Sequence, residues 1–183
     1  MIKMLVTDID GTIMMNDTFI SQNIRDCFRS LSEKGIKIVL ATGRMYSSTA
    51  NIAKDLGLDT PVICYQGGYI RNIIGDAEVL WEKGVEHDIA KDVISFIKSE
   101  NIHINLYAND ELYVENDNDI IQEYSRGKKV PYSVVSSFDD LDAKEFNKIL
   151  AIDNSAEKIE NLVKLLQDKY SDKLYIIRST PYF

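Results

Sequence analysis

The stretch TDIDGTI, residues 7–13, follows the short apolar run IKMLV and carries two aspartates two positions apart. In extended backbone, side chains two positions apart face the same way, so Asp8 and Asp10 are expected to point into one crevice. Gly11 favours a tight loop directly after them. Two carboxylates ~5 Å apart repel by roughly 3 kcal/mol at an effective dielectric of about 20. Such a pair therefore requires a proton, a cation or a hydrogen-bond network.

The first half of the chain has the pattern of alternating strands and helices. Three short apolar runs rich in Ile and Val are typical of strands buried on both faces of a parallel sheet: 2–6, 36–41 and 61–65. Helical patterns separate them over 21–34, starting at the capping residue Ser21 and ending before Gly35, and over roughly 47–56. The order β-α-β-α-β predicts three parallel neighbours whose carboxyl ends share one edge.

A polar cluster that contains glycine follows each expected strand. The clusters are Asp8-Ile9-Asp10-Gly11-Thr12, Thr42-Gly43-Arg44 and Gln66-Gly67-Gly68. Glycine and small polar residues also serve as ordinary turns after strands, so a single cluster is weak evidence for a site. Because open α/β sheets bind ligands at this edge, three aligned clusters together predict a binding site.

The residue types in these clusters suit a phosphoryl group. The two carboxylates are natural ligands of a hard divalent cation such as Mg²⁺. The hydroxyls of Thr12 and Thr42, the N–H groups near Gly11 and Gly43, and Arg44 are all hydrogen-bond donors. With a cation on one side and donors on the other, one carboxylate can attack phosphorus while the second handles the proton of the leaving group.

Composition and motif spacing exclude several other classes. The net charge of -8 disfavours nucleic acid as a partner. No apolar run approaches the ~20 residues of a membrane span, and the amino-terminal run is too short for a secretory signal, so we expect a cytoplasmic protein. A calcium loop that started at Asp8 would have its glycine at the wrong position, and nucleotide-binding and serine-hydrolase motifs do not occur. Cys27 and Cys64 are expected to be small buried hydrophobes rather than a disulfide or metal site.

The pattern changes after Gly67. Residues 69–82 alternate like a hairpin, 102–107 and 111–115 are typical of two paired strands, and Asn154-x-x-Glu157 predicts the capping box of a later helix. Strands joined by short turns predict an antiparallel sheet covered by helices. We therefore expect a partial Rossmann-like parallel-sheet core over 1–82 and an α+β cap domain over 83–183.

Strand-Asp8-x-Asp10-Gly11-Thr12 followed by Ala41-Thr42-Gly43-Arg44 resembles the haloacid dehalogenase superfamily, and specifically its Cof-type sugar-phosphatase branch with a large cap. The resemblance extends to RSTPYF at 178–183, which is similar to a late strand of that cap. It implies an α/β fold and a Mg²⁺-dependent phosphatase that acts on small phosphorylated metabolites.

The resemblance also implies roles for individual residues. Asp8 would be the nucleophile that becomes an aspartyl-phosphate and would bind Mg²⁺ through its other oxygen. Asp10 would be the general acid and base, with its backbone carbonyl on the metal. Thr42 would hold a phosphate oxygen. Six further residues would line the site for phosphate and substrate: Gly11, Thr12, Gly43, Arg44, Gln66 and Gly67.

Two elements of the family pattern are not identifiable in this sequence. The resemblance implies a lysine and a paired-acid motif downstream of the cap, but Lys128-Lys129 and Asp139-Asp140 lie within the cap pattern and follow no core strand. The apolar end at Tyr182-Phe183 favours the amino-terminal part of a longer protein, with an open apolar sheet edge and impaired activity on its own. A phosphotransferase or phosphomutase, or a phosphate-binding module without catalysis, remains as an alternative.

Overall fold

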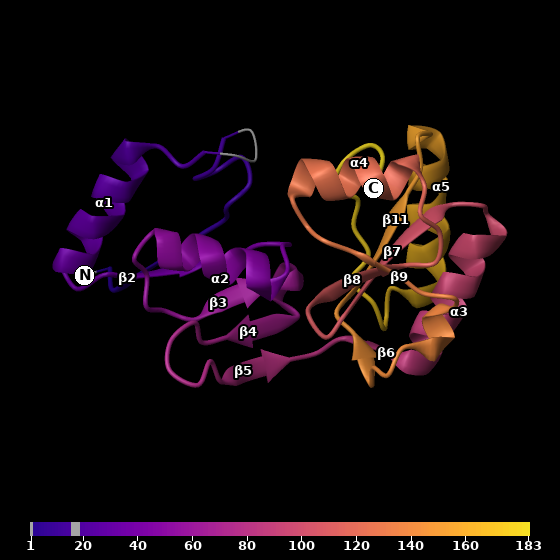
Figure 1. The fold of residues 1–183 in the computed structure, drawn as a ribbon, viewed down its shortest axis with the longest axis horizontal. Coiled ribbons are helices and arrows are strands. Elements are labelled where there is room, and N and C mark those ends of the chain that lie inside the picture. The colour runs from indigo at the N-terminus through magenta and orange to yellow at the C-terminus, as the bar shows by residue number, and fades with distance from the viewer. Residues whose placement is uncertain (1, 16–18) are drawn as a thin grey trace. The chain divides into compact units, whose positions relative to one another are not determined.

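The computed structural model describes residues 2–15 and 19–183 of the chain. Contacts within the chain group it into two compact units, Met1–Lys83 and Gly84–Phe183 (Figure 1). The first unit contains all three polar clusters, each at the end of a strand. Helices alternate with parallel and antiparallel strands along the chain, which confirms the predicted α/β fold class.

A parallel pair of strands begins the first unit. β1 (Met4–Thr7) pairs with β2 (Lys37–Leu40), and α1 (Gln22–Glu33) connects them. The hydroxyl of Ser21 accepts a backbone N–H from the first turn of α1, at 3.4 Å. Gly35 follows the helix with φ 75°, a left-handed conformation that glycine adopts without strain. The predicted start and end of this helix are therefore confirmed.

The third strand begins an antiparallel ladder. β3 (Val62–Cys64) follows α2 (Tyr46–Asp55) and meets the second strand segment through one parallel bridge, between Ala41 and Ile63. β4 (Tyr69–Arg71) and β5 (Val79–Glu82) then fold back beside it in the order β3-β4-β5. β3 runs parallel to the second strand at that bridge, as predicted. Its continuous pairing is with β4 and is antiparallel, because the chain turns back directly after Cys64.

A four-stranded sheet forms the centre of the second unit. β7 (His103–Ala108) and β8 (Glu111–Val114) make the predicted hairpin, and β11 (Lys148–Ile152) pairs with the other edge of β7 in antiparallel fashion. Asn109 and Asp110 at the turn have φ 52° and 60°, which is typical of a two-residue turn whose twist matches the strands.

One pair in this sheet is parallel, which corrects the expectation of a purely antiparallel cap sheet. β9 (Ser133–Val134) pairs with β8 in the same direction, with Tyr113 opposite Ser133. The connection between them contains α4 (Asp119–Lys128), and a helical crossover of this length brings the chain back to run parallel.

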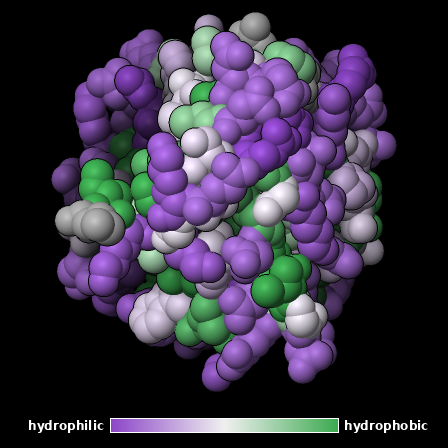
Figure 2. Space-filling view, turned by 90° about the vertical axis from the view of Figure 1, so that its left-hand side faces the viewer, coloured by the Kyte–Doolittle hydropathy of each residue, from purple (hydrophilic) through white to green (hydrophobic). Residues whose placement is uncertain are grey.

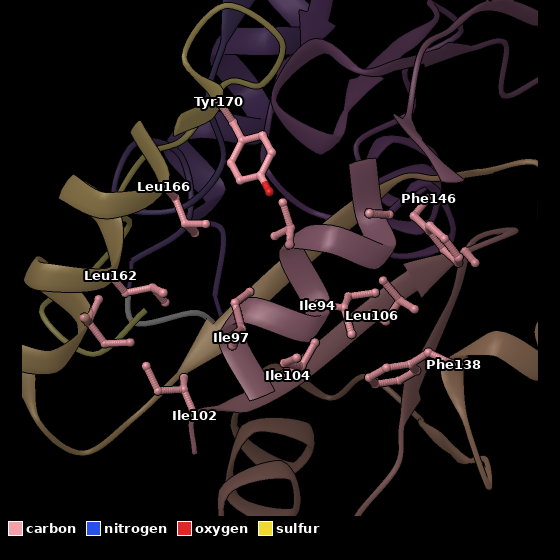
Figure 3. Close-up of a cluster of buried hydrophobic side chains, with 14 residues drawn as sticks. Ile94, Ile97, Ile102, Ile104, Leu106, Phe138, Phe146, Leu162, Leu166 and Tyr170 are labelled. Atoms are coloured by element: carbon pink, nitrogen blue, oxygen red, sulfur yellow. The ribbon is translucent and has the colours of Figure 1, made fainter. Parts of the chain in front are cut away.

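The remaining helices of the second unit build its core against the sheet. α3 (His87–Ser99) and α5 (Ala156–Tyr170) bury one apolar face each, while β6 (Val85–Glu86) pairs with β10 (Glu145–Phe146). Figure 3 shows side chains of α3, α5 and β7 in one cluster, whose labelled members include Ile94, Ile97, Leu106, Leu162 and Leu166. Burying each such side chain contributes about 1.5–3 kcal/mol, so this unit has a hydrophobic core of its own.

Three local predictions were wrong. The N-cap of α5 is Ser155, whose hydroxyl accepts the Lys158 N–H at 3.3 Å, one residue after the predicted cap. Residues 178–183 form no strand, because the N–H groups of Ser179 and Thr180 turn back onto the Phe183 carbonyl at 2.9 and 2.8 Å. Cys27 is exposed, while Cys64 is buried as expected.

Large apolar side chains are exposed on two strands of the first unit. They are Ile2, Met4 and Val6 in and before β1, and Val79, Leu80 and Trp81 on β5. On the face drawn in Figure 2, hydrophobic residues, coloured green, lie among the hydrophilic residues of the surface. Within the part of the chain that the structure describes, β1 pairs along one edge only. No helix of that part is both long and apolar enough to cross a membrane.

Candidate active site

The loop after β1 is a tight turn around one carbonyl. The Ile9 carbonyl accepts the N–H groups of Thr12, Ile13 and Met14 at 3.3, 3.1 and 2.9 Å. Gly11 has φ 73° and donates its N–H to the Met14 carbonyl at 3.0 Å. The Ile9 side chain is fully buried, whereas Asp8 is exposed and Asp10 partly exposed. Alternation along the backbone thus directs the apolar side chain into the core and the two carboxylates away from it.

Asp10 forms a two-point ion pair with Arg44 from the loop after β2. Arg44 Nη2 donates to Asp10 Oδ1 at 2.5 Å and Nε donates to Oδ2 at 2.9 Å. Nη1 lies 3.5 Å from Ser48 Oγ, and the Arg44 N–H donates to Thr42 Oγ1 at 3.3 Å. A planar guanidinium that meets both oxygens of a carboxylate fixes its orientation as well as its charge. The sequence had indicated Arg44 as a donor that lines the site for phosphate and substrate.

The second and third polar clusters are bonded to each other. Gln66 N–H donates to the Thr42 carbonyl at 3.1 Å, and Tyr65 N–H donates to the Arg44 carbonyl, also at 3.1 Å. Gly43 lies beneath the Gln66 amide, because an ideal Cβ at position 43 would be 2.5 Å from Gln66 Nε2. Tyr65 and Gln66 both have positive φ, at 50° and 54°. Backbone hydrogen bonds and the packing of Gln66 on Gly43 therefore hold the two loops together.

The structure brings some of the predicted residues together directly. Asp10 contacts Arg44, and Thr42, Gly43 and Gln66 form a second contacting group. Asp8, Gly11, Thr12 and Gly67 are exposed positions of the same three loops. Sequence reasoning missed Met14, whose sulfur lies 3.7 Å from Arg44 Nη2, and Ser48, which lies in the first turn of α2 just after the loop that carries Arg44.

The donor set near Asp8 and Asp10 suits Mg²⁺ with few protein ligands. Within residues 2–15 and 19–183, no group of three or more His, Cys, Asp or Glu side chains could hold a metal ion. Both carboxylate oxygens of Asp10 face Arg44, so its backbone carbonyl and the exposed Asp8 carboxylate are the oxygen donors that fit a cation. Mg²⁺ accepts hard oxygen ligands and usually keeps several waters, and this set is compatible with that preference.

His103 in the second unit is held neutral by two amides. Asn118 Nδ2 lies 3.2 Å from His103 Nδ1, and His103 Nε2 lies 2.8 Å from Asn105 Oδ1. Because an amide NH₂ group can only donate, Nδ1 accepts and Nε2 carries the proton. Burial lowers the pKa of His103, and the hydrogen bond with Asn105 opposes that shift. Asn118 also caps α4 by accepting the Ile121 N–H at 3.2 Å.

Lys148 on β11 is a second shifted group in this unit. Burial lowers its pKa from 10.5 to about 8, and the charge of Lys128 adds to the shift. Its ammonium group lies 5.8 Å from the ring centroid of Tyr107, whose hydroxyl is 2.8 Å from that of Tyr124. The pairs Lys128-Lys129 and Asp139-Asp140 belong to this unit too, at the end of α4 and in a short 3₁₀ turn.

Residues 5–183 match the family of haloacid dehalogenase-like hydrolases, so the chain belongs to that family. This match confirms the resemblance to the haloacid dehalogenase superfamily. A crystal structure from Thermotoga maritima has a TM-score of 0.82 and 31% sequence identity, and the match covers 100% of this chain and 67% of that one. It shares the fold over the whole of the sequence.

Several curated relatives carry phosphatase names. A Haemophilus influenzae protein called "Putative phosphatase" is 22% identical over 179 residues, which cover 97% of this chain and 65% of that protein. The 5-amino-6-(5-phospho-D-ribitylamino)uracil phosphatase YitU of Bacillus subtilis is 25% identical over 100 residues, or 55% of this chain and 37% of its own length. The chain thus spans about two thirds of the length of the Haemophilus relative.

Proposed function

We propose that this protein is a Mg²⁺-dependent phosphatase that hydrolyses small phosphorylated metabolites such as sugar phosphates through an aspartyl-phosphate on Asp8. The observation that carries the proposal is the arrangement of the first loop, where buried Ile9 separates an exposed Asp8 from an Asp10 fixed by Arg44. Family membership and the phosphatase names of the relatives support the reaction class.

In the first half-reaction, a carboxylate oxygen of Asp8 attacks phosphorus and the ester P–O bond breaks. Asp10, which enters this step in its protonated form, donates that proton to the departing alcohol oxygen. In the second half-reaction, Asp10 takes a proton from water, the water oxygen attacks phosphorus, and the bond to Asp8 breaks to release inorganic phosphate. A bound Mg²⁺ would neutralise phosphate charge and align the phosphate with Asp8.

The donors around the crevice are assigned to the phosphate oxygens. The N–H groups of the loop at Gly11, which the sequence suggested as donors, are already bonded to the Ile9 and Met14 carbonyls. The Thr42 hydroxyl and the exposed Thr12 and Gln66 side chains are therefore the groups assigned to supply hydrogen bonds without a formal positive charge. Such preorganised donors favour the charge that develops on the transferring phosphoryl group. Gly67 is the last of the proposed site residues in the third loop. The second unit is assigned the role of a cap domain, which determines the alcohol portion of the substrate.

The test is hydrolysis of p-nitrophenyl phosphate and a panel of sugar phosphates by protein expressed from its complete coding sequence. Turnover is expected with Mg²⁺ and not after chelation with EDTA. An added acceptor alcohol separates the alternatives, because a phosphotransferase would phosphorylate the acceptor in preference to water. Binding of a phosphate analogue without any turnover would instead indicate a module that lacks the chemistry.

A further inference from the structure

We infer that Arg44 is a positioning residue for Asp10 and not a ligand of the substrate phosphate. This inference rests on the proposed function, because it assigns Arg44 a part in the same reaction. It also changes the role that the sequence suggested for Arg44, which was to line the site for phosphate and substrate as a hydrogen-bond donor.

Every polar nitrogen of the Arg44 side chain already has a partner in the first unit. Nε and Nη2 each donate to one oxygen of Asp10, and Nη1 lies within 3.5 Å of Ser48 Oγ. The Arg44 side chain is 18% exposed, against 36% for Asp10. A phosphate could take the Nε–H and the Nη2–H that face Asp10 only by displacing the carboxylate from this half-buried pair.

The backbone hydrogen bonds that the structure describes in the first loop are made by the Ile9 carbonyl and the Gly11 N–H, on either side of Asp10. The two-point contact with Arg44 fixes the plane of the carboxylate from the neighbouring loop. Each carboxylate oxygen has two lone pairs, so both oxygens keep one for the proton that moves during the reaction.

Arg44 is itself anchored at three points. Its N–H donates to Thr42 Oγ1 at 3.3 Å, its carbonyl accepts the Tyr65 N–H at 3.1 Å, and Ser48 approaches the far end of the guanidinium. The loop after β2 and the first turn of α2 therefore fix the position of Arg44, and Arg44 fixes the orientation of the Asp10 carboxylate. A lysine at this position would keep the positive charge but could not meet both oxygens in one plane.

The test compares two substrates that differ in their need for a proton donor. p-Nitrophenolate leaves without protonation, whereas the sugar hydroxyl of glucose 6-phosphate requires it. In Arg44→Gln, kcat/KM for glucose 6-phosphate is expected to fall about 100-fold, since small misplacements of a catalytic group cost that much. For p-nitrophenyl phosphate, kcat/KM should fall less than about 10-fold. Inhibition by inorganic phosphate should stay within roughly 3-fold.

Two further variants and one control complete the series. Arg44→Lys should lie between wild type and Arg44→Gln, and it replaces Arg44→Gln if that variant does not fold, as judged by circular dichroism. Ser48→Ala should shift the same substrate ratio by a smaller factor. Arg25→Gln is the matched control, because Arg25 pairs with Asp55 at 2.6 Å on the surface of the same unit, and it should change neither substrate.

A phosphate ligand would behave differently. If Arg44→Gln raises KM for both substrates alike and weakens inhibition by inorganic phosphate in parallel, the inference is overturned while the phosphatase assignment stands. If the wild type shows no turnover, the proposed function falls first. Calorimetric binding of inorganic phosphate in the presence of Mg²⁺ then decides the role of Arg44, because binding lost in Arg44→Gln identifies a phosphate ligand and unchanged binding excludes one.

Discussion

The side-chain amide of Gln66 occupies the space in which a side chain at position 43 would lie. An ideal Cβ on Gly43 would be 2.5 Å from Gln66 Nε2 and 3.0 Å from its Cδ. The contact connects the loops after β2 and β3 beside the Thr42 hydroxyl. Gln66 is exposed and its end is flexible, so a methyl group at position 43 can push it aside.

Gly43→Ala is therefore expected to disturb phosphate binding more than folding. The free energy of unfolding should fall by no more than about 1 kcal/mol, at the low end of overpacking effects, while inhibition by inorganic phosphate should weaken. Urea unfolding and inhibition assays measure the two effects. Gly127→Ala is the control, because a Cβ there meets no atom within 4 Å and alanine favours the helix. If adding Gln66→Ala does not relieve the stability loss of Gly43→Ala, the contact is not its cause.

The environment of His103 predicts a loss of stability in mild acid. Its pKa is lowered in the folded protein, so between that value and the ordinary value of 6.5 the unfolded chain binds more protons. The free energy of unfolding should be fully retained above pH 6.5 and decrease as the pH falls below it. Protonation would also place a donor on Nδ1 opposite the donating amide of Asn118.

The measurement is urea unfolding of the second unit between pH 5 and pH 7.5. His103→Gln should flatten the decrease, whereas His87→Gln, at the other histidine of the chain, should leave it intact. A decrease of equal size in both variants would mean that carboxylates, and not His103, cause it.

Lys148 should titrate near pH 8 because it is buried and close to Lys128. Between pH 8 and pH 10.5, roughly the two pKa values of Lys148 in the folded and unfolded protein, the unfolded chain binds more protons than the folded one. The free energy of unfolding should therefore rise with pH through that window. NMR of the isotopically labelled lysine side chains measures the midpoint directly. Lys128→Gln should raise the pKa of Lys148, while Lys144→Gln should not. A midpoint near 10.5 in the wild type would contradict the burial of this ammonium group.

Asp10→Asn separates chemistry from binding. The variant cannot transfer the proton, so turnover should fall by about 10²–10⁴. Mg²⁺ and phosphate-analogue binding should survive better, because the proposed metal contact of residue 10 is its backbone carbonyl. Calorimetry of both ligands beside the rate measurement tests this. Loss of Mg²⁺ binding equal to that in Asp8→Asn would show that the Asp10 side chain is a metal ligand.

Much of the fold was predictable because local signals agreed with it. Ser21 and Gly35 mark both ends of α1, and the alternation of Asp8, Ile9 and Asp10 indicated which side chain enters the core. β9 was not predictable, since a two-residue strand has no measurable period, and its parallel direction follows from the crossover through α4.

The ion pair of Arg44 with Asp10 was beyond sequence reasoning for a different reason. The two residues are 34 positions apart, and the sheet edge that brings their loops together does not specify which donor meets which acid. The sequence indicated the right loops, but an arginine beside a phosphate site is equally suited to the phosphate or to a carboxylate. Only the three-dimensional arrangement distinguishes them.

If Asp8 carries the phosphoryl group during turnover, mass spectrometry of the quenched and digested protein should detect the phosphate there. Protein from the complete coding sequence is mixed with Mg²⁺ and excess substrate, quenched in acid within milliseconds, and digested to locate any added phosphate. We expect phosphate on Asp8 in the wild type, and neither phosphate nor turnover in Asp8→Asn, whose amide is a poor nucleophile. Phosphate on another residue, or a near wild-type rate in Asp8→Asn, would contradict this expectation.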